Sequence, residues 1–148
     1  MTDHSNVRAA TSGVSPLRDR IALGLMSLMS LGSLYVFMDS LLTFDSVPPS
    51  AVAVEAWRMF GYIIFAGLFF LAGVFPRSMP GIWELIIFHK TATALYLIPY
   101  IGIDAGTGVT ATKTILNIIL NDFLLVALTA ISYVLTKGWQ AWRLVGRV

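Results

Sequence analysis

The sequence predicts an all-α membrane protein with four transmembrane helices in an up-down-up-down antiparallel bundle. Of its 148 residues, 57% are hydrophobic and only 12% are charged, whereas soluble domains carry about 25% charged residues. The mean hydropathy is +0.78. The apolar residues gather into four segments, each close to the roughly 20 residues that a spanning helix needs. Short connections between successive segments favour antiparallel neighbours.

The composition also excludes several classes of protein. High apolar content with a net charge of only +2 excludes a disordered chain, and so small a basic excess gives no reason to expect a nucleic-acid partner. The absence of cysteine excludes disulfides, thiolate metal sites and iron–sulfur clusters. The expected partner is the lipid bilayer, while a homo-oligomer or a larger membrane complex stays open. The sequence specifies no cofactor.

Breaks in the hydrophobic pattern set the expected boundaries. Residues 1–17 are small and polar and predict a flexible cytoplasmic tail. Residues 18–138 are expected to form the transmembrane domain, and residues 139–148 a short basic cytoplasmic tail with Trp139 and Trp142 at the membrane interface. Proline- and glycine-containing turns separate the four spans, which are expected at 21–44, 52–75, 82–101 and 114–136.

The distribution of lysine and arginine predicts the orientation, because cytoplasmic loops carry an excess of both. Seven of these residues fall on the side of the two termini and two on the opposite side. Both termini are therefore expected in the cytoplasm, although the sequence does not say of which membrane. The seven are Arg8, Arg18, Arg20, Arg77, Lys137, Arg143 and Arg147, and the two are Arg58 and Lys113.

Lys90 and Asp122 are the strongest candidates for a buried site. Lys90 lies near the middle of the third span, and Asp122 about three residues, or roughly 4–5 Å, outward of the middle of the fourth. A charge at the centre of a bilayer costs about 2.5 kcal/mol or more and needs a partner. The matching depth predicts an ion pair, whose role is either to hold two helices together or to handle protons or a ligand.

His89 begins a stripe of polar side chains on the third span. At 100° per residue, His89, Thr93, Tyr96 and Tyr100 share one face, and the stripe is expected to line a cavity or a helix seam. The alternative is a histidine that bonds to Asn117 or Asn121, with the tyrosines in an aromatic belt. The asparagines are expected chiefly to hydrogen-bond across a helix interface.

The other charges lie near the membrane surfaces. Arg77 is expected to reach Glu84, beside which Trp83 suits an interfacial anchor. Arg58 is expected to meet Asp39 or Glu55, or to be solvated. One intramembrane histidine without cysteine leaves too few ligands for a metal, so no metal site is expected. The candidate catalytic residues are Lys90, His89 and Asp122, and the candidate ligand-binding residues are Tyr96, Thr93, Asn121, Asn117 and Glu84.

A glycine-studded second span that ends in Pro-Arg carries a family resemblance. The segments Arg58-Met59-Phe60-Gly61-Tyr62 and Gly73-Val74-Phe75-Pro76-Arg77 resemble the small DoxX-like four-helix membrane proteins. The segment from Arg58 to Arg77 covers 20 of the 148 residues, and no family site can be carried over onto these positions. The resemblance implies a link to membrane oxidoreductase or quinone-related systems.

Three classes of function are compatible with these features. The first is a bundle that binds a hydrophobic small molecule (quinone-, lipid- or terpenoid-like) near buried ionisable residues, accessory to a membrane redox system. The second is a small membrane enzyme, an isomerase, cyclase or oxidoreductase, that uses His, Lys and Asp as acid–base groups. The third is a structural or assembly subunit of a membrane complex. The sequence does not decide whether the protein is an enzyme.

Overall fold

The computed structural model describes residues 13–101 and 109–147, and within these two ranges every regular element is helical. The short connections contain two 3₁₀ turns, and a third 3₁₀ helix follows the last long helix. The long helices are α2 (Pro16–Leu42), α3 (Val52–Val74), α4 (Ile82–Leu97) and α5 (Val109–Thr136), and the 3₁₀ elements are η1 (Phe44–Ser46), η2 (Ile98–Tyr100) and η3 (Gly138–Arg147).

Prolines mark several helix ends. Pro16 occupies the first turn of α2, where its fixed φ suits a helix and its missing N–H costs nothing. The first helix therefore begins five residues before the start expected at residue 21. Pro99 follows α4, and the chain tightens into η2 there because a proline removes the backbone donor that the α-helical ladder needs.

Three helices of the described chain are long and apolar enough to cross a membrane: α2, α3 and residues Ile115–Thr136 of α5. The fourth expected span, 82–101, corresponds to α4, which has only 16 residues. At 1.5 Å per residue it is about 24 Å long, shorter than the roughly 30 Å hydrocarbon core. The expectation of one regular helix through residue 101 was wrong because Pro99 ends it.

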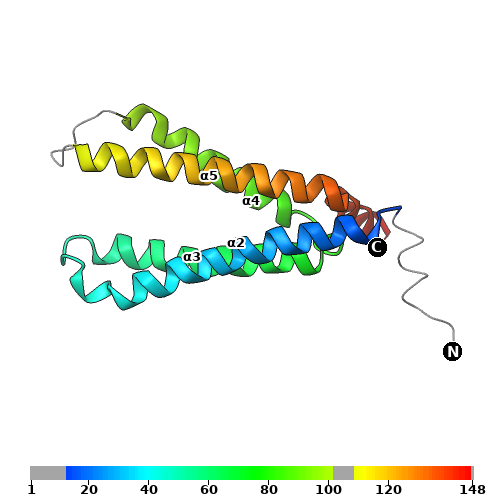
Figure 1. The fold of residues 1–148 in the computed structure, drawn as a ribbon, viewed down its shortest axis with the longest axis horizontal. Coiled ribbons are helices and arrows are strands. Elements are labelled where there is room, and N and C mark those ends of the chain that lie inside the picture. The colour runs from blue at the N-terminus through cyan, green and yellow to red at the C-terminus, as the bar shows by residue number, and fades with distance from the viewer. Residues whose placement is uncertain (1–12, 102–108, 148) are drawn as a thin grey trace.

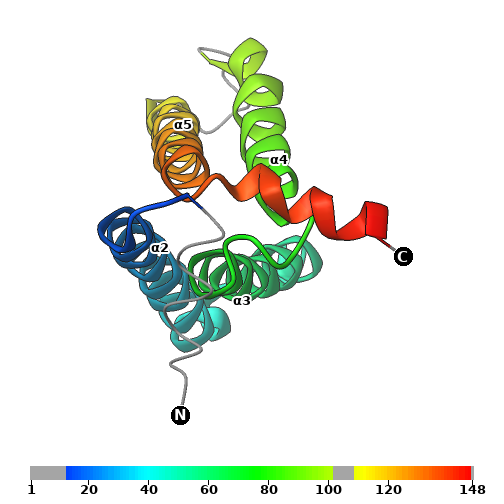
Figure 2. The same cartoon turned by 90° about the vertical axis from the view of Figure 1, so that its right-hand side faces the viewer.

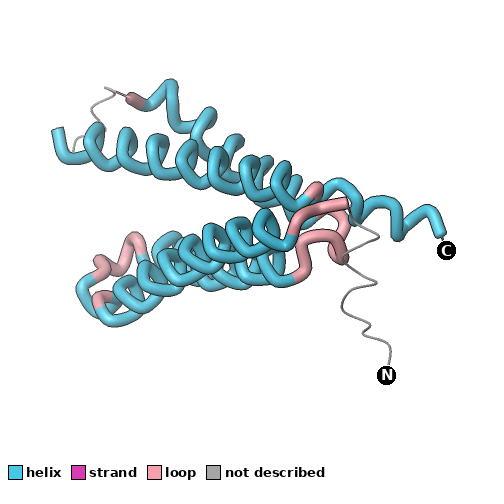
Figure 3. Tube along the Cα trace, turned by 45° about the vertical axis from the view of Figure 1, so that its right-hand side comes forward, coloured by secondary structure: helices cyan, strands magenta, loops and turns pink. Residues whose placement is uncertain are grey.

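The four long helices form two hairpins, α2 with α3 and α4 with α5 (Figure 1). The hairpins meet mainly where α2 packs on α5, while α3 and α4 touch over only a few residues. They converge at the end that carries both ends of the described chain and diverge toward the opposite end (Figure 3). These ends are named the terminal end and the far end below.

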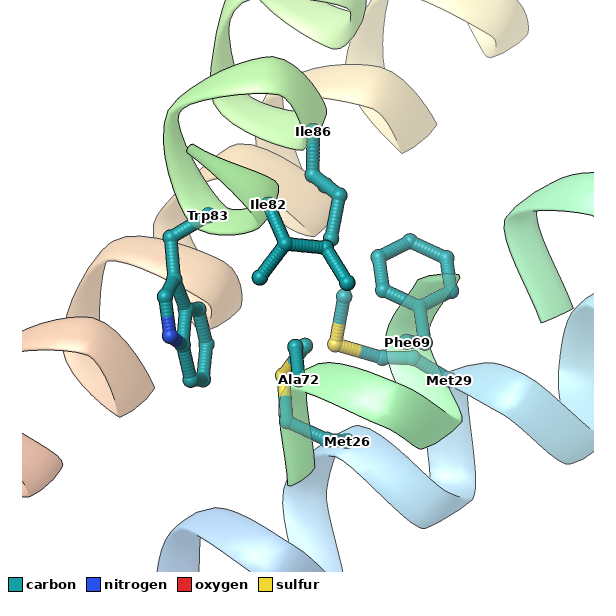
Figure 4. Packing of buried hydrophobic residues seen from close by; sticks show 7 residues of the cluster. All are labelled: Met26, Met29, Phe69, Ala72, Ile82, Trp83 and Ile86. Carbon is teal, nitrogen blue, oxygen red and sulfur yellow. The ribbon is translucent and has the colours of Figure 1, made fainter. Parts of the chain in front are cut away.

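The hydrophobic core lies near the terminal end. Phe69 and Ala72 of α3 pack there with Met26 and Met29 of α2 and with the first turns of α4 (Figure 4). No residue of α2 beyond Met29 is buried. The helices of the two hairpins are therefore packed together near the terminal end. Toward the far end, α2 contributes no buried residue. The cluster comprises Met26, Met29, Phe69, Ala72, Ile82, Trp83 and Ile86.

The chain after α5 does not form the tail that was expected over residues 139–148. Lys137 takes a φ of 53°, which turns the chain sharply so that η3 runs across the terminal end (Figure 2). Ala141 of η3 is buried, and a Cβ on Gly138 would come within 2.8 Å of the Trp83 Nε1 atom. The close approach at Gly138 is what permits this helix to seal the core.

Candidate functional site

The ion pair expected from helix depth is present. The Nζ atom of Lys90 on α4 lies 3.0 Å from the Oδ1 atom of Asp122 on α5, and the side chains are 13% and 5% exposed. An isolated charge in such surroundings is strongly disfavoured by desolvation. The pair therefore joins α4 to the apolar helix α5, and its role beyond that stays a prediction.

Phe65 of α3 connects this pair to the first hairpin. The Lys90 ammonium lies 4.5 Å from the centroid of the Phe65 ring, within the distance at which a cation is attracted to a ring face. The ring also packs against the core. Sequence reasoning missed Phe65, because one phenylalanine in an uncharged helix gives no signal that distinguishes it from its neighbours. Three helices thus contribute to the site: α3, α4 and α5.

His89 lies beside Lys90 on the same phenylalanine. The His89 and Phe65 rings are tilted, with centroids 4.7 Å apart, and the His89 side chain is otherwise exposed. Lys90 and His89 therefore both contact the Phe65 ring, from two directions that differ by the 100° step between consecutive helical residues. This geometry gives the site two nitrogen-bearing side chains, one paired with a carboxylate and one exposed.

The rest of the predicted stripe does not enter a helix seam. Tyr96 is 70% exposed and stacks on Tyr100 with ring centroids 5.7 Å apart, while the Thr93 hydroxyl donates to the His89 carbonyl of its own helix. The expectation of a seam was wrong for the tyrosines because α4 packs mainly on α5, and the face that carries Tyr96 and Tyr100 is left uncovered.

The two asparagines of α5 are also exposed. Asn117 and Asn121 lie on the outside of the helix, while the adjacent Asp122 turns inward to Lys90. Residues one apart on a helix point in different directions, so the side chain that meets α4 is the aspartate. The proposed role of the asparagines in ligand binding is neither supported nor excluded by this placement.

Glu84 takes part in a second polar cluster, near the terminal end. Its Oε1 atom accepts hydrogen bonds from the Tyr133 hydroxyl at 2.6 Å and from Trp142 Nε1 at 3.0 Å. These bonds join α4, α5 and η3. The adjacent Trp83, expected at the membrane interface, is instead buried and donates to the Pro76 carbonyl at 3.0 Å. The expectation for Trp83 failed because η3 covers this end of the core.

Arg77 does not pair with Glu84, as had been expected. Its guanidinium makes a bidentate contact with Asp19 of α2, at 2.8 and 2.7 Å, and donates to the Thr136 carbonyl of α5 at 2.9 Å. The Asp19 hydrogen bond raises the pKa of Arg77 above its ordinary value, against a smaller opposite effect of burial. The planar fork of Arg77 matches the Asp19 carboxylate, while the Glu84 carboxylate is already engaged by Tyr133 and Trp142.

At the far end, Arg58 pairs with Glu55 one turn away rather than with Asp39. The Arg58 side chain is 51% exposed and that of Glu55 30%, so solvent screens the pair and it contributes little to stability. Within the described residues, no three His, Asp or Glu side chains are grouped so that they could hold a metal ion.

No protein-family model, curated protein or solved structure matches this chain. The helices themselves define its class. Three apolar helices of spanning length, with exposed surfaces dominated by large hydrophobic side chains, make this a multi-pass integral membrane protein in contact with the lipid bilayer.

Proposed function

We propose that the protein binds a hydrophobic small molecule between its two helical hairpins, with the polar end of that molecule near Lys90, Asp122 and His89. A quinone-, lipid- or terpenoid-like ligand fits this description. The observation that carries the proposal is the group around Phe65, where a paired lysine and an exposed histidine share one ring within the membrane-spanning part of the bundle.

The chemistry of these groups favours a ligand over a purely structural role. A buried ion pair that only joins two helices is no more stabilising than well-packed apolar residues. His89 adds an exposed donor and acceptor beside the pair, on the side where α3 and α4 have few contacts. A ligand carbonyl or hydroxyl could accept from Lys90 or His89, while its apolar body would pack on the exposed hydrophobic side chains of α3 and α4.

The proposal includes the four-helix topology expected from the sequence. In it all four long helices cross the membrane, η2 extends the short α4, and both termini lie in the cytoplasm with the basic terminal end. Support comes from the contact between Lys137 Nζ and the Gly13 carbonyl, 3.3 Å apart, because it joins the two ends of the described chain at the same end of the bundle. The DoxX-like resemblance would agree with such a bundle and with an accessory redox role.

Reporter fusions test this topology. Fusions after residues 47, 78, 107 and 148 should read out, in, out and in. A cytoplasmic signal at residue 107 would contradict the crossing by α4. It would leave the contacts around Phe65 in place, so the binding proposal needs its own experiment.

Analysis of co-purifying small molecules tests the binding proposal. The wild-type protein and the variants Lys90→Met and Phe65→Leu would be purified in a mild detergent, and their extracts compared by mass spectrometry. Phe70→Leu is the matched control, because Phe70 lies on the same helix but is exposed away from the core. A compound enriched in the wild type and in the control, and depleted from both site variants, is the expected result. Identical extracts from all four proteins would contradict the proposal.

A further inference from the structure

The terminal end carries an excess of cations over carboxylates. Among the described residues, the two carboxylates there are already engaged: Asp19 by Arg77, and Glu84 by Tyr133 and Trp142. Four cations are left without a carboxylate partner in this part of the structure. We name them the basic collar: Arg18, Arg20, Lys137 and Arg143.

The geometry of the basic collar suits a membrane surface. Arg18 and Arg20 are exposed on the first turns of α2, and Arg143 is exposed on η3, which crosses the terminal end at a steep angle to the spanning helices (Figure 2). Trp139 and Trp142 of η3 are 41% and 50% exposed. Tryptophan rings favour the level of the lipid headgroups.

The attachment of η3 holds these side chains in place. Trp142 donates to Glu84, and the buried Ala141 fixes the inner face of η3 on the core. The chain from α5 into η3 is anchored by Lys137, whose Nζ atom also meets the Gly13 carbonyl. The Gly13 carbonyl carries no formal charge, so this contact does not pair Lys137 with a carboxylate.

The far end has the opposite character. Its described charged side chains are Asp39, Asp45 and the Glu55–Arg58 pair, and Lys113 lies in the first turns of α5, so carboxylates outnumber cations there by three to two. The terminal end of the bundle is therefore more positive than the far end. The difference arises from the number of cations at the terminal end and from the pairing of both carboxylates there with other side chains.

We propose that the basic collar and η3 form a docking surface for the headgroups of anionic phospholipids. Each Lys or Arg near an anionic surface strengthens the association up to about fivefold, equivalent to about 1 kcal/mol. Charge complementarity selects the anionic lipid, and the tryptophans set the depth at which η3 lies. This surface is separate from the site around Phe65, so the two proposals can fail independently.

Tryptophan quenching by brominated lipids tests the proposal. The protein with Trp57→Phe would be reconstituted into phosphatidylcholine bilayers that contain brominated phosphatidylglycerol or brominated phosphatidylcholine. Trp57 is exposed near the far end, and its removal leaves Trp139 and Trp142 as the accessible reporters beside Trp83, which is buried. Several-fold stronger association of phosphatidylglycerol is expected, and it should weaken as salt shortens the screening length from about 10 Å to about 3 Å.

Matched variants locate the effect. Arg18→Gln, Arg20→Gln and Arg143→Gln together should abolish the preference, and Arg143→Gln alone should reduce it if the triple variant does not fold. Arg58→Gln at the far end should change nothing. Equal quenching by the two lipids, or a preference that survives the substitutions, would overturn the proposal. So would full competition by soluble glycerol phosphate, because that result assigns the collar to a soluble anion instead of a bilayer.

Discussion

The coupling between Lys90 and Asp122 can be measured with a double-mutant cycle. Lys90→Met leaves the Asp122 carboxylate, whose side chain is 5% exposed, without the cation 3.0 Å away. Asp122→Leu strands the ammonium in the same way. Each single change should therefore cost more than the loss of one contact, because the surviving charge is buried without a partner.

The expected magnitudes follow from this desolvation. An unpaired charge within a membrane span costs about 3 kcal/mol on insertion scales, and breaking a buried pair costs about 3–5 kcal/mol. Lys90→Met also removes the contact with Phe65, worth about 0.5–2 kcal/mol, and this loss persists in the double variant. We expect about 3 kcal/mol for each single variant and only about 1–2 kcal/mol for the double variant.

Unfolding in mixed micelles by a denaturing detergent would supply the free energies. The exposed Glu55–Arg58 pair is the matched control, and its cycle should give a coupling of about 0–1 kcal/mol. A double variant of Lys90 and Asp122 that loses about 6 kcal/mol, the sum of the singles, would show that the two residues do not act as partners. A double variant that folds normally but no longer binds the ligand would show that the pair takes part in ligand binding.

Two further changes test the packing and the terminal end. A Cβ on Gly73 would lie 2.9 Å from the Met26 Cβ atom, so Gly73→Ala should destabilise the α2–α3 hairpin by about 1–3 kcal/mol in the same unfolding assay. Gly67→Ala, where a Cβ meets open space, should be neutral or stabilising; equal effects would contradict this packing. Arg77→Gln should cost about 1–3 kcal/mol, far more than Arg58→Gln. Because the pKa of Arg77 is raised, its contribution is complete below the ordinary arginine pKa and is lost only as pH rises through the raised value. The cost should thus be constant from about pH 6 to pH 9, and a decline across that range would contradict it.

The helices and the central ion pair could be predicted because they depend on local pattern and depth. Apolar runs and proline-containing breaks place the ends of the helices to within about five residues, and helix rise alone places Lys90 and Asp122 at similar depth. The 3₁₀ helix η3 could not be predicted in this way. Its position depends on the left-handed turn at Lys137 and on the close approach at Gly138, neither of which leaves a periodic signal.

Partner choice was the least predictable feature. Arg77 lies seven residues from Glu84 but contacts Asp19, which is far away in sequence and near in space because α2 packs on α5 and α3. Trp83 was expected at the interface because tryptophans are common there, yet η3 covers it. Phe65 had no distinguishing signal at all. Each of these contacts depends on which helices are neighbours, and hydrophobic periodicity does not reveal that.

Photo-crosslinking from position 89 tests the proposed ligand site most directly. A benzophenone amino acid would replace His89, whose side chain is exposed beside Phe65, and in a control it would replace Phe88, which is 71% exposed on an adjacent face of α4. After irradiation in cells, intact-protein mass spectrometry would give the mass of any adduct. A discrete hydrophobic compound attached at position 89 and absent at position 88 is the predicted result. The same bulk phospholipid adducts at both positions would contradict a binding site between the hairpins.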